Sequence, residues 1–439
     1  MSPWRPLCAA LACAAWAAGC ATGAPYERDL AATHRALDAG DPGAARAALE
    51  ALLTEGRRSG PEAVLLGLEL GTVSLGAGDL AAASAALATA DPRLDVIDLS
   101  RDDAGEVASW LFADAARPYR SPPWEKLMVN VLGMASRLAS GDRRGALVEA
   151  RRFEVVARFF RDRGENPGPL LAVGELLAAT AHRAVGREAV ARRYESQASR
   201  RAPAWAAAVA DGPGEARAAW AALAWPLGVA QMVEAELVRA RSGELVVVAL
   251  SGRVAAKVAQ RVDTASAERL AAQPGAAQNL AELGVKELVL VGLAGAPAAE
   301  PPGIRLAGQP LPTLWADLGA TARAAFAAAR PAFARAAITR ALSRQAVRRT
   351  VAAADGAPKP GARPGWGAVL GDLISGTMAA TDTPDTRAWS TLPAHVGLAR
   401  VRLPAGRYVV EVGARAVEVE LTRGRPTVVL ISDFASPAH

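Results

Sequence analysis

Residues 37–45, LDAGDPGAA, carry the phrase that decides most of the fold of this 439-residue chain. The same pattern, LxxGDxxxA, recurs at residues 75–83 and 138–146, and a weaker copy runs from Gly186 to Ala191. The leucine ends one helix, the glycine permits a left-handed cap, and the aspartate opens the next helix. The alanine stands where two helices can cross closely. Each phrase therefore predicts one helix-turn-helix hairpin.

The spacing of these phrases predicts an uneven array. The four glycines lie 38, 63 and 45 residues apart, whereas regular tetratricopeptide arrays repeat about every 34 residues. The turn resembles the inter-helix turn of tetratricopeptide-like repeats, so residues 29–240 are predicted to form an irregular helical repeat domain. A plain helical bundle that reuses a good turn is the alternative.

The hydrophobic period changes near residue 242, which predicts an α+β chain. Short β-branched runs at 244–250 and 287–291 indicate buried strands, and 314–354 returns to helix with a break expected at Pro331. The expected order is a mixed strand and helix region at 243–354, a Gly/Pro linker at 355–367, and a C-terminal region at 368–439. That last region combines a short helix with an antiparallel meander of strands at 395–402, 406–412, 416–422 and 427–432. The meander is predicted as one sheet of a small β-sandwich, which the two earlier strands at 244–250 and 287–291 could complete.

The first nineteen residues have the pattern of an export signal. One positive charge at Arg5 precedes an apolar run, and small residues then lead to Cys20, the last of three cysteines. This resembles a bacterial lipoprotein signal, which implies cleavage before Cys20, lipid on its thiol, and a lipidated tether at 20–28. Ala21 follows the cysteine where an aspartate would mark inner-membrane retention, which favours the periplasmic face of the outer membrane. The alternative is an ordinary secretory signal with a chance cysteine.

Composition argues against several classes of function. The net charge is +6, yet only four of the 50 basic residues are lysines, and no basic cluster is interleaved with aromatic residues, so nucleic-acid binding is not expected. The four histidines lack metal-ligand spacing, and no HExxH, GxSxG or GxxxxGK[ST] motif occurs. We therefore expect no catalytic residues, no metal, no cofactor and no enzymatic activity.

Three groups of residues are candidates for an interaction or structural role. Glu149 with Arg151 and Arg152 could form a buried ion-pair hub, or a surface pair between Glu149 and Arg152. Arg340, Arg344 and Arg348 repeat at four-residue steps, which predicts a basic stripe for an anionic partner or a solvated face. The core side is predicted at Ile338, Leu342 and Ala346. Asp385, Arg387 and Trp389 predict a structural corner at the sandwich edge, or an exposed contact for a protein or glycan.

Taken together, the lipobox, the helical region and the β-containing end resemble a family of uncharacterised bacterial outer-membrane lipoproteins. The resemblance is carried by blocks at 121–125, 147–152, 340–349 and, most specifically, 385–394, DTRAWSTLPA. It implies architecture and location. The predicted function is a non-catalytic, lipid-anchored periplasmic scaffold or adaptor that binds envelope proteins through its helices. The alternative is a cell-wall or polysaccharide enzyme, or an accessory subunit of an envelope export machine.

Overall fold

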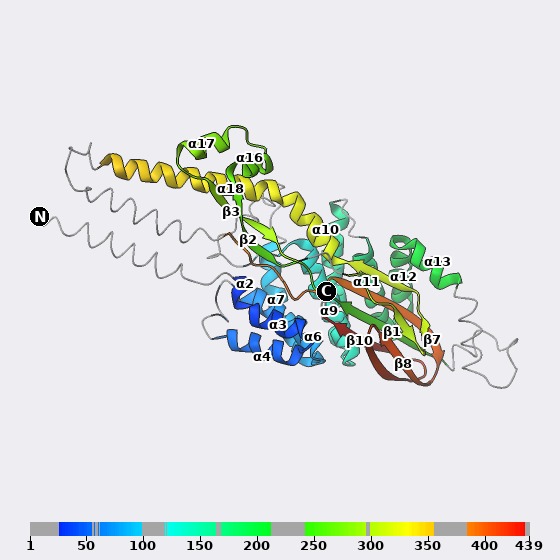
Figure 1. Ribbon diagram of the computed structural model, residues 1–439. Helices are drawn as coiled ribbons and strands as arrows, with labels where there is room; N and C mark the ends of the chain where they lie inside the picture. Colours follow the sequence, from blue (N-terminus) through cyan, green and yellow to red (C-terminus); the bar gives the residue numbers. More distant parts are fainter. Residues whose placement is uncertain are drawn as a thin grey trace, which may run out of the picture.

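The computed structural model is an α+β chain, with helices in its N-terminal part and mostly antiparallel sheets in its C-terminal part (Figure 1). It describes residues 26–54, 57, 60, 62–98, 119, 121–163, 168–211, 242–295, 299–354 and 384–434. Cys20 and Ala21, the linker predicted at 355–367 and the short helix predicted after it lie outside these residues.

The N-terminal helices pair as the repeated phrase predicts. Their bounds are α2 Tyr26–Asp29, α3 Ala31–Asp38, α4 Pro42–Leu52, α6 Ala63–Gly76, α7 Leu80–Asp98, α9 Pro123–Ala139, α10 Arg143–Asp162, α11 Pro169–Arg183, α12 Glu188–Arg201 and α13 Pro203–Asp211. Each phrase forms the turn of one hairpin, from α3–α4 to α11–α12. Residues 26–28, at the end of the tether predicted at 20–28, belong to helix α2, and Tyr26 is buried.

The turns have the expected chemistry. Gly40, Gly78, Gly141 and Gly186 all have positive φ, between 72° and 80°. In the first three turns the aspartate side chain accepts a hydrogen bond from a backbone N–H three residues on, at 2.8–2.9 Å. The alanine of each phrase is fully buried, as close helix crossing requires.

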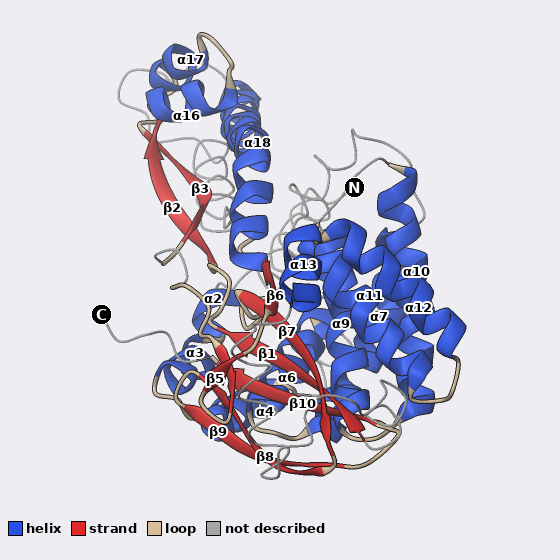
Figure 2. Cartoon of the chain, turned by 90° about the vertical axis from the view of Figure 1, so that its right-hand side faces the viewer, coloured by secondary structure: helices blue, strands red, loops and turns tan. Residues whose placement is uncertain are grey.

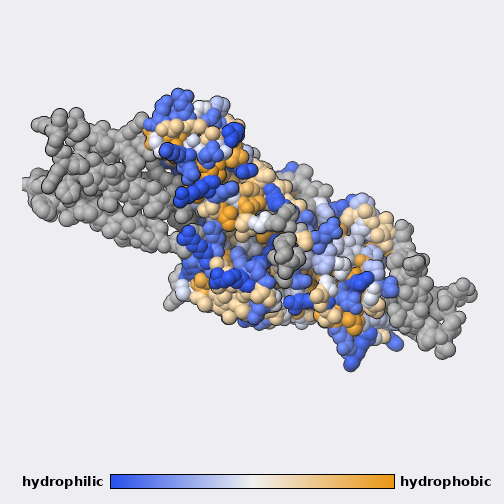
Figure 3. Space-filling model, viewed as in Figure 1, coloured by the Kyte–Doolittle hydropathy of each residue, from blue (hydrophilic) through white to orange (hydrophobic). Residues whose placement is uncertain are grey.

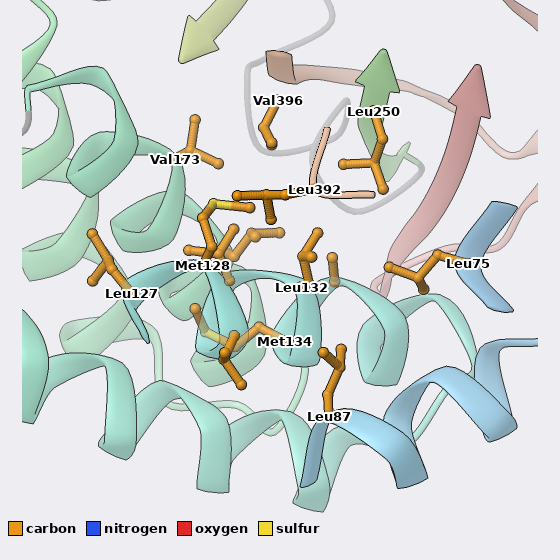
Figure 4. Packing of buried hydrophobic residues seen from close by; sticks show 14 of the residues in the cluster. Leu75, Leu87, Leu127, Met128, Leu132, Met134, Val173, Leu250, Leu392 and Val396 are labelled. Atoms are coloured by element: carbon orange, nitrogen blue, oxygen red, sulfur yellow. The ribbon is translucent and has the colours of Figure 1, made fainter. Parts of the chain in front are cut away.

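The first helices of three hairpins, α6, α9 and α11, are buried along most of their length. Their partners α7, α10 and α12 cover one side. The other side packs against the C-terminal part of the chain, as shown by a shared cluster in which Leu132 and Val173 approach Leu250, Leu392 and Val396 (Figure 4). The inner surface of the helical array is therefore filled by this chain's own strands.

Within the described residues the strands form three sheets. Their bounds are β1 Ser242–Ser251, β2 Lys257–Asp263, β3 Glu287–Leu293, β4 Ile304–Leu306, β5 Gln309–Pro310, β6 Thr313–Asp317, β7 His395–Pro404, β8 Gly406–Val412, β9 Arg415–Leu421 and β10 Pro426–Asp433. Sheet A has the order β10-β1-β7-β6, sheet B is β2-β3, and sheet C has the order β5-β4-β8-β9. Figure 2 shows sheets A and C beside the helices, with sheet B set apart from them.

Strand β1 is the centre of the fold because both of its faces are buried. Val246, Val248 and Leu250 belong to the cluster shared with the helices. Leu245, Val247 and Ala249 belong to a second cluster, shared with strands of sheet C. Burial on both faces explains why residues 244–250 form an almost continuous apolar run, and it confirms the prediction of a buried strand there.

The prediction of one terminal meander is wrong. Of the four last strands, β7 pairs with β1 and β6, whereas β8 and β9 form a hairpin in sheet C. Strand β10 returns to sheet A and pairs with β1 in parallel, with Val247 opposite Val429. The apolar faces of these strands fit two different neighbours, so the regions predicted separately at 243–354 and 368–439 share both four-stranded sheets.

The helix predicted from residue 314 begins later and does not break. Residues 313–317 form β6, in which Leu314 and Ala316 alternate into the core. Helix α18 (Leu318–Ala354) then continues through Pro331. Proline removes one backbone donor, but Phe333 and Ala334 just beyond it are buried, and this packing holds the helix together.

Sheet B, helices α16 (Thr264–Ala271) and α17 (Ala276–Glu282), and the middle of α18 make an arm that stands away from the main body (Figure 2). Its apolar cluster is separate and rich in alanine, and its larger buried members are Leu280, Leu288, Leu290 and Ile338. This confirms Ile338 on the core side of α18, and Leu342 packs partly against the same cluster. The arm is joined to the body mainly through β2, β3 and α18.

Candidate functional site

The 384–394 segment, which contains DTRAWSTLPA, lies on the helical array around the carboxylate of Glu69. Ser390 donates its N–H and its hydroxyl to Oε1 at 2.8 and 3.0 Å. Thr391 donates its N–H to Oε2 at 2.9 Å and its hydroxyl to the same oxygen. Tyr26 donates to Oε1 at 3.3 Å. Glu69 is fully buried, so these donors replace the water that a carboxylate needs.

Trp389 and Arg387 fix the two sides of this segment. The Trp389 indole N–H donates to the Thr72 hydroxyl at 2.8 Å, and its side chain is fully buried among the helices. The prediction that Trp389 covers the edge of a sandwich is therefore wrong. Its side chain is buried against the apolar face of α6 instead. Arg387 pairs with Asp385 through two bonds of 2.9 and 2.8 Å, as the predicted corner requires.

Burial shifts the pKa values of Glu69 and His34 in this cluster. Burial raises the pKa of Glu69 and outweighs the Ser390 and Thr391 hydrogen bonds that favour its charged form. Burial also lowers the pKa of His34 to about 4. The His34 imidazole is therefore neutral near pH 7 and lies with Nε2 at 2.8 Å from the Ser390 hydroxyl.

A serine, a histidine and a glutamate meet here, but in the wrong order for nucleophilic catalysis. In a catalytic triad the carboxylate orients the imidazole, which in turn takes the serine proton. Here Glu69 binds Ser390 directly, and the main-chain N–H groups of Ser390 and Thr391 bind the same carboxylate. Ser390 is also only 6% exposed. This arrangement ties the C-terminal segment to helices α3 and α6.

The predicted hub at Glu149 is buried, with a different set of partners. Glu149 is 3% exposed and lies 3.4 Å from Arg152 and 3.6 Å from Arg137. Arg152 also pairs with buried Asp91 at 3.0 Å. The inclusion of Arg151 was wrong, because its position on α10 turns it to solvent. The hub joins α7, α9 and α10, which favours the prediction of a buried pair over a surface one.

Two further residues complete this hub. Asn130 donates to Asp91 and to Glu149, both at 3.3 Å. Lys126 is 1% exposed, and burial lowers its pKa to about 8 against the opposing charge of Asp91. Burial also disfavours the charged form of Glu149 and so raises its pKa. The cluster has the character of a polar core that sets the register of three helices.

A second ion-pair network, which the sequence did not reveal, joins the helices to sheet A. Arg183 of α11 pairs with Glu195 of α12 at 2.6 Å and with buried Glu244 of β1 at 3.2 Å. Arg400 of β7 pairs with the same two glutamates. The only sequence signal is Glu244 at the start of an apolar strand. Glu69 has the same signal, a lone acid in the apolar helix 63–76.

The basic stripe predicted at Arg340, Arg344 and Arg348 belongs to helix α18. Arg340 is half-buried on the arm, and the side chains of Arg344 and Arg348 lie outside the described residues. The stripe therefore stays a prediction. Within the described part of the chain, no group of histidine, cysteine and acidic side chains is arranged to hold a metal ion. Nor does any helix there have the length and apolar character of a membrane span.

Apolar and hydrophilic residues are interspersed on the visible face of the described residues, with no single dominant patch (Figure 3). The chain matches no protein-family model, no curated protein and no solved structure. Its candidate sites therefore stand on their geometry alone.

Proposed function

We propose that this chain is a non-catalytic, lipid-anchored adaptor of the bacterial envelope, held by Cys20 at the periplasmic face of the outer membrane. The observation that carries the proposal is the closeness of the folded body to that cysteine. Tyr26 is only six residues beyond Cys20, is 4% exposed and donates to Glu69. Six residues span no more than about 20 Å, so a lipid on Cys20 would keep the body near the membrane surface.

The buried polar clusters support an adaptor role. Glu69 binds the 384–394 segment, the Glu149 hub sets the register of α7, α9 and α10, and Glu244 joins the helices to sheet A. Each cluster rigidifies the connection between distant parts of the chain, which suits a body that presents fixed surfaces. Since the inner face of the array is filled, partner binding is proposed for the outer faces of the helices.

We further propose that the hairpins form an irregular tetratricopeptide-like array, and that sheets A and C form a small β-sandwich. The four turns at Gly40, Gly78, Gly141 and Gly186 support the array. The apolar cluster that β1, β7 and β10 share with β4, β8 and β9 supports the sandwich. The resemblance to the lipoprotein family remains part of this proposal.

The anchor is tested by Cys20→Ser, followed by separation of membrane and soluble fractions. We expect the wild-type chain to stay with outer-membrane fractions and Cys20→Ser to be lost from them, because acyl chains contribute about 0.8 kcal/mol per buried methylene. Mass spectrometry of the wild-type N-terminal peptide should show the lipid. Wild-type protein that is free of membranes and carries no lipid would overturn the proposal.

A further inference from the structure

Helix α10 presents one regular stripe to solvent. Between residues 143 and 160 the exposed positions are Arg144, Val148, Arg151, Val155 and Arg158. The steps between them are four, three, four and three residues, the spacing of the contact positions of a heptad. We call these five residues the α10 stripe.

The two valines of the stripe are unusually exposed. Val148 is 44% and Val155 55% exposed, and among the described residues they are the only pair of exposed large apolar side chains on one helix. Half-buried Leu147 and Phe159 flank them and widen the apolar track. The outer positions of α7 are instead small or polar, at Ala81, Ala85 and Thr89.

The three arginines of the stripe carry uncompensated charge. In the described part of the chain no carboxylate lies within ion-pair distance of Arg144, Arg151 or Arg158, whereas Arg152 and Arg161 of the same helix pair with Asp91 and Glu154. Arg144 and Arg158 are fourteen positions apart on the helix, so the charges extend over about 21 Å.

We propose that the α10 stripe binds an amphipathic helix with acidic side chains on a partner protein. Heptad spacing fits a second helix lying along α10, with apolar side chains against Val148 and Val155 and carboxylates against the arginines. A second copy of this chain fits poorly, because an antiparallel pair of stripes would bring Arg151 against Arg151. The charge of the stripe thus selects an acidic partner.

This inference rests on the proposed adaptor function and names its binding surface. One helix on a stripe of this length buries less than the roughly 800 Å² per partner of a standard interface. Contact in solution should be weak. When both proteins are anchored to the same cell envelope, their effective concentration rises and compensates for the weak affinity.

The binding test uses the full-length lipidated protein in detergent and two synthetic 21-residue helices. Both have leucine at heptad position a; one has glutamate and the other lysine at d, e and g. We expect the acidic helix to bind with a Kd on the order of 10–100 µM. Arg144→Glu/Arg151→Glu/Arg158→Glu should weaken this at least about tenfold. The matched charge reversal Arg28→Glu/Arg35→Glu/Arg330→Glu, at exposed positions of other helices, should not.

In cells, a photocrosslinking amino acid at Val155 should yield an adduct with a partner protein, and the crosslinked peptide should come from an acidic helix. The adduct should be lost when the three stripe arginines are changed to glutamate. It should persist in the matched charge-reversal control. No adduct, an adduct with another copy of this chain, or equal binding of the lysine helix would overturn the inference. Membrane fractionation separates the two proposals, because the stripe variants leave Cys20 intact, whereas loss of the anchor leaves peptide binding in detergent unchanged.

Discussion

Single residues join parts of this chain that are far apart in the sequence. Glu69 is the strongest case, since one carboxylate receives donors from Tyr26, Ser390 and Thr391. A buried carboxylate without donors would cost several kcal/mol. The 384–394 segment therefore gives the Glu69 carboxylate the hydrogen bonds that water would otherwise provide. In return, Glu69 accepts from the backbone N–H groups of a segment that belongs to neither a helix nor a strand.

Replacing Glu69 by glutamine should destabilise the fold. A glutamine side chain offers one acceptor oxygen and turns two donors toward the donors of Ser390 and Thr391. The free energy of unfolding should fall by about 1–3 kcal/mol. Urea unfolding followed by circular dichroism measures this. Glu50→Gln, which removes only an exposed pair with Arg46, should change it by less than about 0.5 kcal/mol; equal effects of the two changes would contradict the role of Glu69.

His34 should make stability depend on mild acid. Its folded pKa of about 4 lies below the ordinary value of 6.5, so between these values the unfolded chain binds more protons. The contribution of His34 is thus complete above pH 6.5 and is lost as the pH falls toward 4, by no more than about 3.5 kcal/mol. Unfolding at several pH values should show a shallower slope for His34→Gln than for wild type. Parallel slopes would refute this assignment.

At the scale of elements, glycines set how closely the helices approach. A Cβ on Gly71 would lie 2.8 Å from Leu87, and one on Gly174 would lie 2.1 Å from Phe153. The first helices therefore accept side chains from their neighbours at these points. The turn glycines act differently, through a positive φ that other residues adopt only with strain.

The hairpin turns give a matched pair of glycine substitutions. Gly141→Ala forces alanine to φ near 80° and should cost about 1–2 kcal/mol. Gly67→Ala, within α6, meets Ala90 only at an ordinary 3.6 Å and should be neutral or stabilise by up to about 1 kcal/mol. In thermal unfolding, Gly141→Ala should lower Tm, whereas Gly67→Ala should leave Tm unchanged or raise it.

At the scale of the whole molecule, the described residues divide into a main body and an arm with separate apolar clusters. Sheet A is the shared wall of the body, with helices on one face and sheet C on the other. The arm has its own cluster, and its strands begin and end side by side, since Lys257 pairs with Leu293. The body should therefore fold without the arm.

Replacing residues 258–292 by a short Gly-Ser linker tests this independence. The ends to be joined are already neighbours, and the cluster lost from α18 is largely alanine. We expect cooperative thermal unfolding with Tm within about 4 °C of wild type. Ile304→Asp, which buries a charge in the cluster between the two large sheets, should instead abolish cooperative unfolding. Loss of folding on removing the arm would show that the clusters are coupled.

The sequence by itself determined what depends on neighbouring residues. The turn phrase placed four hairpins, since a glycine cap acts within a few residues and an aspartate N-cap reinforces it in the first three. The apolar run at 244–250 predicted a buried strand. At the candidate sites it identified Glu149 with Arg152, and the pairing of Asp385 with Arg387, because these residues are close in the chain.

Only the tertiary structure decided the pairings that cross the chain. The four terminal strands divide between two sheets: β7 and β10 pair with the two edges of β1, whereas β8 pairs with β4 and with β9. Trp389 lies in the helical core, where Thr72 accepts its indole N–H. Glu69 and Glu244 gained their roles the same way. Local patterns specify backbone conformation, whereas the partners of a buried charge or an apolar face are set by which surfaces remain uncovered when the whole chain packs.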